Sequence, residues 1–219
     1  MRITKIENQK RRPGRKNIYV DGEFLTGVSG ETLLRLALRT GDELGAEQIK
    51  VLKKTEELVS ARNVALRYLA TRPRTVREVR DKLRDREFAE AEIARVIEEL
   101  KHSGLLDDEE FARLYIRNAL TLKPSGELLL RRRLLLLGVE KQIVERALCD
   151  TIRVGDRVEQ ASRAAETFLK RSAKARGGES PEKMRQRLSA YLARRGFSWD
   201  VIEEILKKTS RTVNTASDE

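Results

Sequence analysis

The sequence is poor in the side chains that most often carry chemistry. Its 219 residues include one cysteine, Cys149, and one histidine, His102. A single cysteine excludes an internal disulfide, and one cysteine with one histidine cannot assemble a Cys/His metal site. Cys149 lies next to Leu148 and Ala147, in an apolar run that continues at helical spacing from Val144. This pattern predicts that Cys149 is a small buried hydrophobic residue rather than a nucleophile. No metal and no other cofactor is therefore expected.

Long apolar runs and common enzyme motifs are also missing. The first residues hold no apolar signal-peptide core, and no apolar run approaches the ~18 residues that a membrane span needs. We therefore expect a cytoplasmic protein. No G-x-x-x-x-G-K phosphate loop is present and no G-x-G-x-x-G follows a predicted strand, which disfavours an enzyme. The acidic run at 107–110 could serve metal or acid–base chemistry, but its place at a predicted helix start explains it through the helix dipole.

Charge, in contrast, is abundant. Lys and Arg number 46 and Asp and Glu 35, a net charge of +11, whereas hydrophobic residues make up only 39% of the chain. One large core would be thin at this composition, so several small helical units fit better. The basic excess favours an anionic partner such as nucleic acid or an acidic protein surface. The alternative is a salt-bridged helical surface whose net charge is incidental.

Apolar residues recur in three copies of one pattern. Phe88, Val139 and Phe197 serve as reference positions, and the residues nine and five before and five, eight and nine after each of them are apolar. These residues are Val79, Leu83, Ile93, Val96 and Ile97; Leu130, Leu134, Val144, Ala147 and Leu148; and Leu188, Leu192, Ile202, Ile205 and Leu206. Each copy predicts two helices joined by a turn, with one more amphipathic helix upstream. Glycine precedes the reference in the second and third copies, and Glu87 stands there in the first.

The first sixty residues differ from the copies. "RITKIENQ" and "KNIYVDGEFLTGV" predict short strands, with Asp21-Gly22 as a hairpin turn. Between them lies "KRRPGRK", with five basic residues around a Pro-Gly. This segment is either a loop that contacts phosphate or an ordinary solvated turn. The predicted fold is mainly α, with three tandem three-helix repeats that form an elongated curved body after a small N-terminal segment with a β-hairpin. The expected boundaries are 1–59 for this extension with its hairpin and short helices, 60–107, 108–152 and 153–209 for the repeats, and 210–219 for a flexible tail.

The stretch "GLLDDEEFARLYIRN" predicts a tight joint between two helices. Gly104 suits the left-handed conformation that ends a helix, and Leu105 would then fold back onto Leu100. Asp107 follows as an N-cap, with Glu110 at capping-box spacing. The two helices are therefore expected to be joined with little freedom between them.

At these residues the chain resembles a known family. The run "GLLDDEEFARLYI", Lys123 with Ser125-Gly126, and "LLLLGVEKQIVERAL" are together similar to the RecX family of bacterial regulators of the RecA recombinase, over roughly residues 60 to 208. The resemblance implies a non-enzymatic protein that lies in the groove of RecA filaments on single-stranded DNA. It also implies that the protein modulates ATP hydrolysis, strand exchange and co-protease activity. Through these activities it would influence DNA repair, homologous recombination and the SOS response. The residues that match the family motif are Gly104, Leu105, Leu106, Asp107, Asp108, Phe111 and Ala112. The N-terminal hairpin segment and the basic link after Lys170 depart from that pattern.

Two surfaces are candidates for contact with the partner. On a helix from Ser125 to Leu137, with Leu130 toward the core, some leucines and arginines point outward by the ~100° step per residue. They either meet the filament or pack against a neighbouring repeat. These residues are Leu128, Arg131, Arg132 and Leu135. The second candidate surface is basic and lies in the third repeat, at Lys170, Arg171, Arg194 and Arg195.

Two functions remain open from the sequence. The first is a regulator, mainly an inhibitor, that binds the RecA filament as a monomer, with single-stranded DNA met inside the filament. The alternative is a stand-alone basic helical protein that binds DNA through phosphate contacts, with its helix pairs used like helix-turn-helix units. Aromatic residues make up only 5% of the chain, fewer than stacking on bare DNA would favour.

Overall fold

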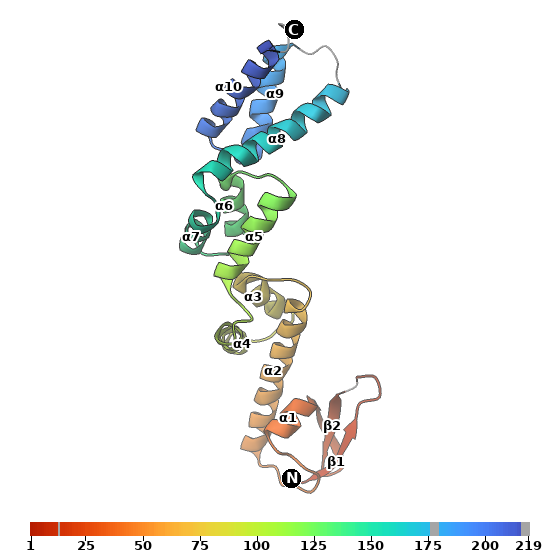
Figure 1. Cartoon of the computed structure of the whole chain (residues 1–219). Helices are drawn as coiled ribbons and strands as arrows, with labels where there is room; N and C mark the ends of the chain where they lie inside the picture. The colour runs from red at the N-terminus through yellow and green to blue at the C-terminus, as the bar shows by residue number, and fades with distance from the viewer. Residues whose placement is uncertain (13, 176–179, 216–219) are drawn as a thin grey trace. The chain divides into compact units, whose positions relative to one another are not determined.

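The computed structural model describes residues 1–12, 14–175 and 180–215 (Figure 1). It is mainly helical with one small antiparallel sheet, as the sequence predicts. The last residues of the expected tail and part of the basic link after Lys170 lie outside the described residues. The contacts divide the chain into two compact units. Unit 1 comprises residues 1–74 and 78–106, and unit 2 comprises residues 75–77 and the chain from Asp107 onward.

Unit 1 begins with a three-stranded meander. The strands pair antiparallel in chain order, with Ile18 and Val28 fully buried beneath the sheet. The predicted hairpin is confirmed, since the turn residues Asp21 and Gly22 have φ of 50° and 90°, as a tight two-residue turn requires. The strands are β1 (Ile3–Asn8), β2 (Arg15–Val20) and β3 (Glu23–Ser29).

The helices of unit 1 cover this sheet and then build the first copy. Leu33 and Leu52 join the sheet residues in one buried cluster. Helix α2 runs from Ala46 to Leu69 without glycine or proline, so one helix carries residues of both the predicted extension and the first repeat. The boundary between the two therefore remains a prediction. The helices in this part of the chain are α1 (Gly30–Arg35), α2 (Ala46–Leu69), α3 (Val76–Arg84) and α4 (Glu90–His102).

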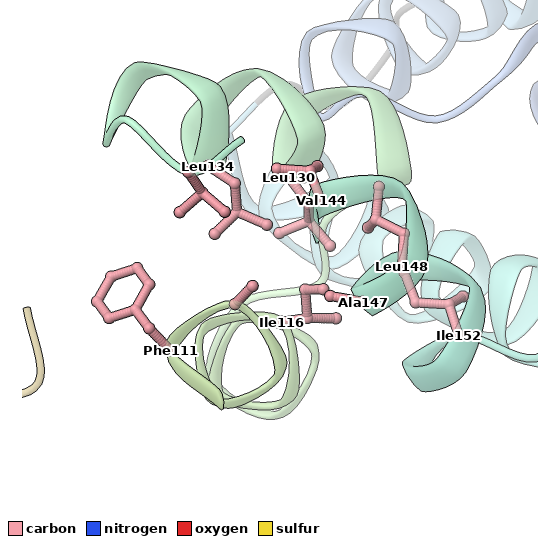
Figure 2. Close-up of a cluster of buried hydrophobic side chains, with 10 residues drawn as sticks. Phe111, Ile116, Leu130, Leu134, Val144, Ala147, Leu148 and Ile152 are labelled. Carbon is pink, nitrogen blue, oxygen red and sulfur yellow. The ribbon is translucent and has the colours of Figure 1, made fainter. Parts of the chain in front are cut away.

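Unit 2 contains the helices of the second and third copies. Figure 2 shows Leu130, Leu134 and Val144 directed into one interior with the apolar side chains of α5. A separate cluster joins Ala161, Leu192 and Ile202 of the third copy. Helix α10 reaches Thr215 and so enters the segment expected to be a flexible tail, because neither glycine nor proline interrupts it. The helices are α5 (Asp108–Leu122), α6 (Glu127–Leu136), α7 (Lys141–Thr151), α8 (Val154–Ala175), α9 (Pro181–Arg194) and α10 (Trp199–Thr215).

The predicted repeat register agrees with the burial of the side chains. The fifteen apolar positions that flank the reference residues are all buried, with at most 5% of their surface exposed. Of the reference residues themselves, Val139 and Phe197 are buried and Phe88 is half-buried. The turns also coincide. The reference residue donates its N–H to the carbonyl five residues earlier, from Phe88 to Leu83 at 3.3 Å, from Val139 to Leu134 at 3.1 Å and from Phe197 to Leu192 at 3.2 Å. This is the hydrogen bond of a Schellman helix end, repeated three times.

Such a helix end needs one residue in the left-handed region. Gly138 and Gly196 supply it with φ of 86° and 80°, and in the first copy Glu87 has φ of 62°. A side chain there brings Cβ close to the backbone and costs about 1–2 kcal/mol. The turn is therefore imposed on Glu87 by the packing around it, and the first copy has the same shape at a higher conformational energy.

Replacing Glu87 by glycine should stabilise the protein. Relief of the left-handed strain exceeds the extra chain entropy that glycine gives the unfolded state, for a net gain of about 0.5–1 kcal/mol. We expect the melting temperature to rise by about 1–4 °C in thermal denaturation. Glu87→Ala keeps the Cβ atom and is the matched control, for which no rise is expected. An equal rise in both variants would assign the gain to loss of the carboxylate.

Two expectations about single residues are wrong. Cys149 is exposed, because it lies one residue past Leu148, about 100° around α7 from the core-facing side. Leu105 is 57% exposed, whereas Leu106 is only 2% exposed. The expected helix end is nevertheless present, since Gly104 has φ of 69° and Leu105 donates its N–H to the Leu100 carbonyl at 3.0 Å.

Candidate partner-binding surfaces

Helix α6 is apolar on more than one side. Leu130 and Leu134 are fully buried, while Leu128, Leu135 and Leu136 are 53%, 39% and 68% exposed. The outward position predicted for Leu128 and Leu135 is confirmed, and Leu136 is an exposed leucine that the sequence reasoning missed. Its exposure could not be inferred from its being a leucine, because seven leucines occupy positions between 128 and 137. Exposed leucines on one helix are unusual for a solvated surface and typical of a contact region.

The two predicted arginines of α6 have different surroundings. Arg131 donates from Nε and from a terminal nitrogen to the two carboxylate oxygens of Glu145 on α7, at 2.7 and 2.9 Å. These hydrogen bonds raise the pKa of Arg131 and hold the pKa of Glu145 below its ordinary value. Arg132 is exposed and forms no ion pair with any residue that the structure describes. Of the two, Arg132 is therefore the one available to a partner, and Arg131 holds α6 against α7.

A tight backbone contact joins the second and third copies within unit 2. Gly126, the N-cap of α6, donates its N–H to the Arg195 carbonyl at 2.9 Å, and Leu128 donates to the Gly196 carbonyl at 3.1 Å. The first turn of a helix has N–H groups without partners inside the helix. The turn after α9 therefore caps the start of α6.

The same contact explains Arg195, which the sequence offered as a partner-binding residue. Its guanidinium donates to the Pro124 carbonyl and to the Tyr191 hydroxyl, both at 3.0 Å. It also lies over the Tyr191 ring, 5.2 Å from the centroid. Arg195 therefore joins the third copy to the second. Lys170, Arg171 and Arg194 are exposed, and they form no ion pair within the described part of the chain.

Residues 75–77 take part in a corresponding contact within unit 2. Thr75 donates its hydroxyl to the Leu137 carbonyl at 2.7 Å. A Cβ atom on Gly138 would come within 2.2 Å of the Arg77 side chain. The turn after α6 therefore lies against the start of α3, as the turn after α9 lies against the start of α6.

The family-motif residues form the joint between helices. Asp107 caps α5 by accepting the N–H groups of Glu109 and Glu110 at 2.8 and 3.1 Å. Asp108 accepts the N–H of Val76 at the start of α3, at 2.9 Å. Phe111 and Ala112 are buried in the core of the second copy. Neighbouring aspartates thus cap two different helices, which gives the acidic run a structural role.

Neither a metal site nor a membrane segment is evident in the described residues. Within them, no group of three or more His, Cys, Asp and Glu side chains is arranged to hold a metal ion. None of the helices described combines the length and apolar character of a membrane-crossing segment.

Comparison with known proteins places the chain in a family. Family models match residues 1–45 (regulatory protein RecX N-terminal domain), 61–100 (RecX, first three-helix domain) and 156–206 (RecX, third three-helix domain). The expectation that the N-terminal hairpin segment departs from the family pattern is therefore wrong, since this segment matches a RecX domain too.

Curated relatives and a solved structure agree with these models. A regulatory protein RecX of Bacillus licheniformis is 33% identical over 207 residues, 94% of this chain and 77% of that protein. One of Lactobacillus delbrueckii subsp. bulgaricus is 39% identical over 148 residues, 68% of this chain, and the chain spans only 54% of its length. A crystal structure of regulatory protein RecX has a TM-score of 0.73 at 27% identity, covering 93% of this chain and 98% of that one. The chain belongs to the RecX family of regulatory proteins.

Proposed function

We propose that this protein regulates the RecA recombinase, mainly as an inhibitor, by binding in the groove of RecA filaments on single-stranded DNA. Bound there, it modulates ATP hydrolysis, strand exchange and co-protease activity. Family membership supports the proposal, because the relatives are named regulatory proteins. The observation that carries it to particular residues is the outward face of α6, where Leu128, Leu135 and Leu136 are exposed around Arg132.

This face, Leu128, Arg132, Leu135 and Leu136, has the composition of a binding centre. Apolar side chains release water when a partner covers them, at about 25 cal/mol per Å². Arginine adds planar donors that pair with carboxylate or phosphate, and it is enriched where contacts dominate affinity. The ion pair of Arg131 with Glu145 keeps α6 fixed against α7, so the face is held in one orientation before binding. A fixed surface loses less entropy on binding.

Reversal of one charge on this face tests the proposal. We expect Arg132→Glu to raise the concentration needed for half-inhibition of the DNA-dependent ATPase of RecA by about tenfold or more, as at a contact centre. Arg131 is left intact, because a glutamate there would lie against Glu145. The melting temperature should change by less than about 2 °C, since an exposed charge contributes little to stability.

Arg95→Glu is the matched control, because Arg95 is exposed on α4 and the charge change is the same. It should inhibit like the parent. If Arg132→Glu also inhibits like the parent at matched salt, the contact lies elsewhere, and Lys170→Glu with Arg171→Glu tests the third copy. If no form affects RecA, regulation of RecA is wrong. A stand-alone DNA-binding protein would then be recognised by affinity for bare DNA that falls steeply with salt and gains nothing from the filament.

A further inference from the structure

Unit 1 contains a basic groove that the proposed function does not use. The groove has a volume of about 860 Å³ and lies between the loop that joins β1 to β2, helix α2 and the turn after α3. Five arginines line it against a single carboxylate, that of Glu56. They come from three separate segments of the chain, and they are Arg11, Arg12, Arg15, Arg67 and Arg86.

The one carboxylate is already neutralised. Glu56 is 8% exposed, and one of its oxygens pairs with Arg15 at 2.9 Å. The other oxygen accepts the Ser29 N–H at 2.8 Å and the Thr32 hydroxyl at 2.6 Å. A buried carboxylate is tolerated only when paired and hydrogen-bonded in this way. Glu56 thus fixes Arg15 and the end of β3 on α2, and it offers little repulsion to an anion.

The remaining four arginines of the groove are able to pair with an anionic ligand. Arg11, Arg12, Arg67 and Arg86 are exposed, and none of them forms an ion pair within the residues that the structure describes. Arg67 donates from Nε to the Asn63 carbonyl at 3.1 Å, which leaves its two terminal nitrogens for a ligand. Positive charges around a concave surface focus the potential and attract anions.

The basic loop is held in place by its backbone. Arg15 donates its N–H to the Arg12 carbonyl at 3.1 Å, which closes a turn. Gly30 donates its N–H to the Gly14 carbonyl at 2.9 Å, which fastens the loop to the start of α1. These bonds tie the backbone of Arg12 and Gly14 to Arg15 and Gly30, so the groove arginines are already brought together before an anion binds.

The groove also has an apolar part. Phe88, Val64 and Leu66 line it and are half-buried, beside the polar side chains of Ser60 and Asn63. An aromatic ring next to arginines can stack on a nucleobase while the arginines pair with phosphate. Base faces are accessible in this way only in an unpaired strand. An acidic peptide would use the arginines but not the ring.

We propose that this groove binds the phosphate backbone of single-stranded nucleic acid, with Arg11, Arg12, Arg67 and Arg86 as the phosphate contacts. A nucleic-acid strand bound in this groove would contact unit 1, whereas the α6 face belongs to unit 2. The inference deepens the proposed function by locating a second partner site on the same chain. Its test contains no RecA, so failure here leaves the α6 proposal intact, and failure of the α6 proposal leaves this site intact.

The test measures binding of the full chain to labelled oligothymidylate by fluorescence anisotropy, over roughly 50 to 200 mM salt. The groove variant carries Arg11→Ala, Arg12→Ala and Arg67→Ala. Loss of three phosphate contacts should weaken binding about tenfold or more and reduce the slope of log affinity against log salt by about 2. Arg86→Ala alone, on another wall of the groove, should reduce the slope by about 0.7.

The matched control carries Lys53→Ala, Lys54→Ala and Arg95→Ala, which remove the same charge from exposed positions outside the groove. We expect the control to lose less than about threefold in affinity. Equal losses in control and groove variant would overturn the proposal, because overall charge would then explain binding. Displacement of oligothymidylate by polyglutamate as effective as that by unlabelled strand would also overturn it, in favour of an acidic protein segment. An oligouridylate arm distinguishes RNA from DNA as the source of the strand.

Discussion

Val144→Asp is expected to unfold at least the second copy. Val144 is fully buried among Leu130, Leu148 and other apolar side chains of α5, α6 and α7 (Figure 2). Removal of the valine forfeits about 1.5–3 kcal/mol of apolar burial. The aspartate that replaces it must either remain charged without a partner or take up a proton, and either costs several kcal/mol. The total is comparable to the whole stability of a small domain, about 5–15 kcal/mol.

Circular dichroism and thermal melting measure this effect. We expect a loss of helical signal, or a melting temperature lower by about 15 °C or more. Gln142→Asp is the control, because Gln142 is exposed in the first turn of α7 and an acidic residue there suits the helix dipole. Parent-like helicity and cooperative melting in Val144→Asp would show that the repeat register is wrong.

Gly126→Ala is expected to have the second largest effect, by separating the second copy from the third. Gly126 has φ of −80° and ψ of 160°, a conformation open to any residue, so its backbone does not require glycine. Glycine is required because there is no space for a side chain. A Cβ atom there would be 2.1 Å from the Gly196 carbonyl oxygen and 2.4 Å from the Phe197 nitrogen, and backbone atoms cannot turn aside as a flexible side chain can.

The two backbone hydrogen bonds of this contact would lengthen or break with the shift. Overpacking costs about 1–3 kcal/mol, and each buried group left unpaired adds about 1–3 kcal/mol. We expect a clearly lower urea midpoint. Gly155→Ala is the matched control, because a Cβ atom on Gly155 meets nothing within 4 Å and alanine favours the helix. The control should be as stable as the parent or slightly more. Equal stability of both variants would show that the contact between copies tolerates a methyl group.

The apolar pattern predicted most of the fold because it reports burial directly. Val79, Leu130 and Leu188 occupy one position of the three copies and all lie in helix cores. The Asp21-Gly22 turn was predictable for a related reason, since few residues adopt two successive positive φ values. The continuity of α2 was not predictable, because repetition of a pattern does not say whether the helix before it stops. The turn at Glu87 was predictable only from its glycine counterparts.

The candidate sites were harder to predict, because they depend on what each polar group meets. Arg131, Arg132 and Arg195 are alike in sequence, yet Glu145 pairs with the first and the Pro124 carbonyl accepts from the last. Helical periodicity gives the direction of a side chain and not its partner. The groove of unit 1 shows the same limit. Its loop was visible as "KRRPGRK", whereas Arg67 and Arg86 join that loop only after folding.

The start of α6, in the second copy, depends on the third copy. The first N–H groups of α6 find their acceptors in Arg195 and Gly196. Helix α9 instead begins with Pro181, which has no N–H, and the Ser180 hydroxyl accepts the N–H of Lys183. Deletion of the third copy would remove these acceptors from the start of α6, so we expect the second copy to be less stable without the third than within the full chain.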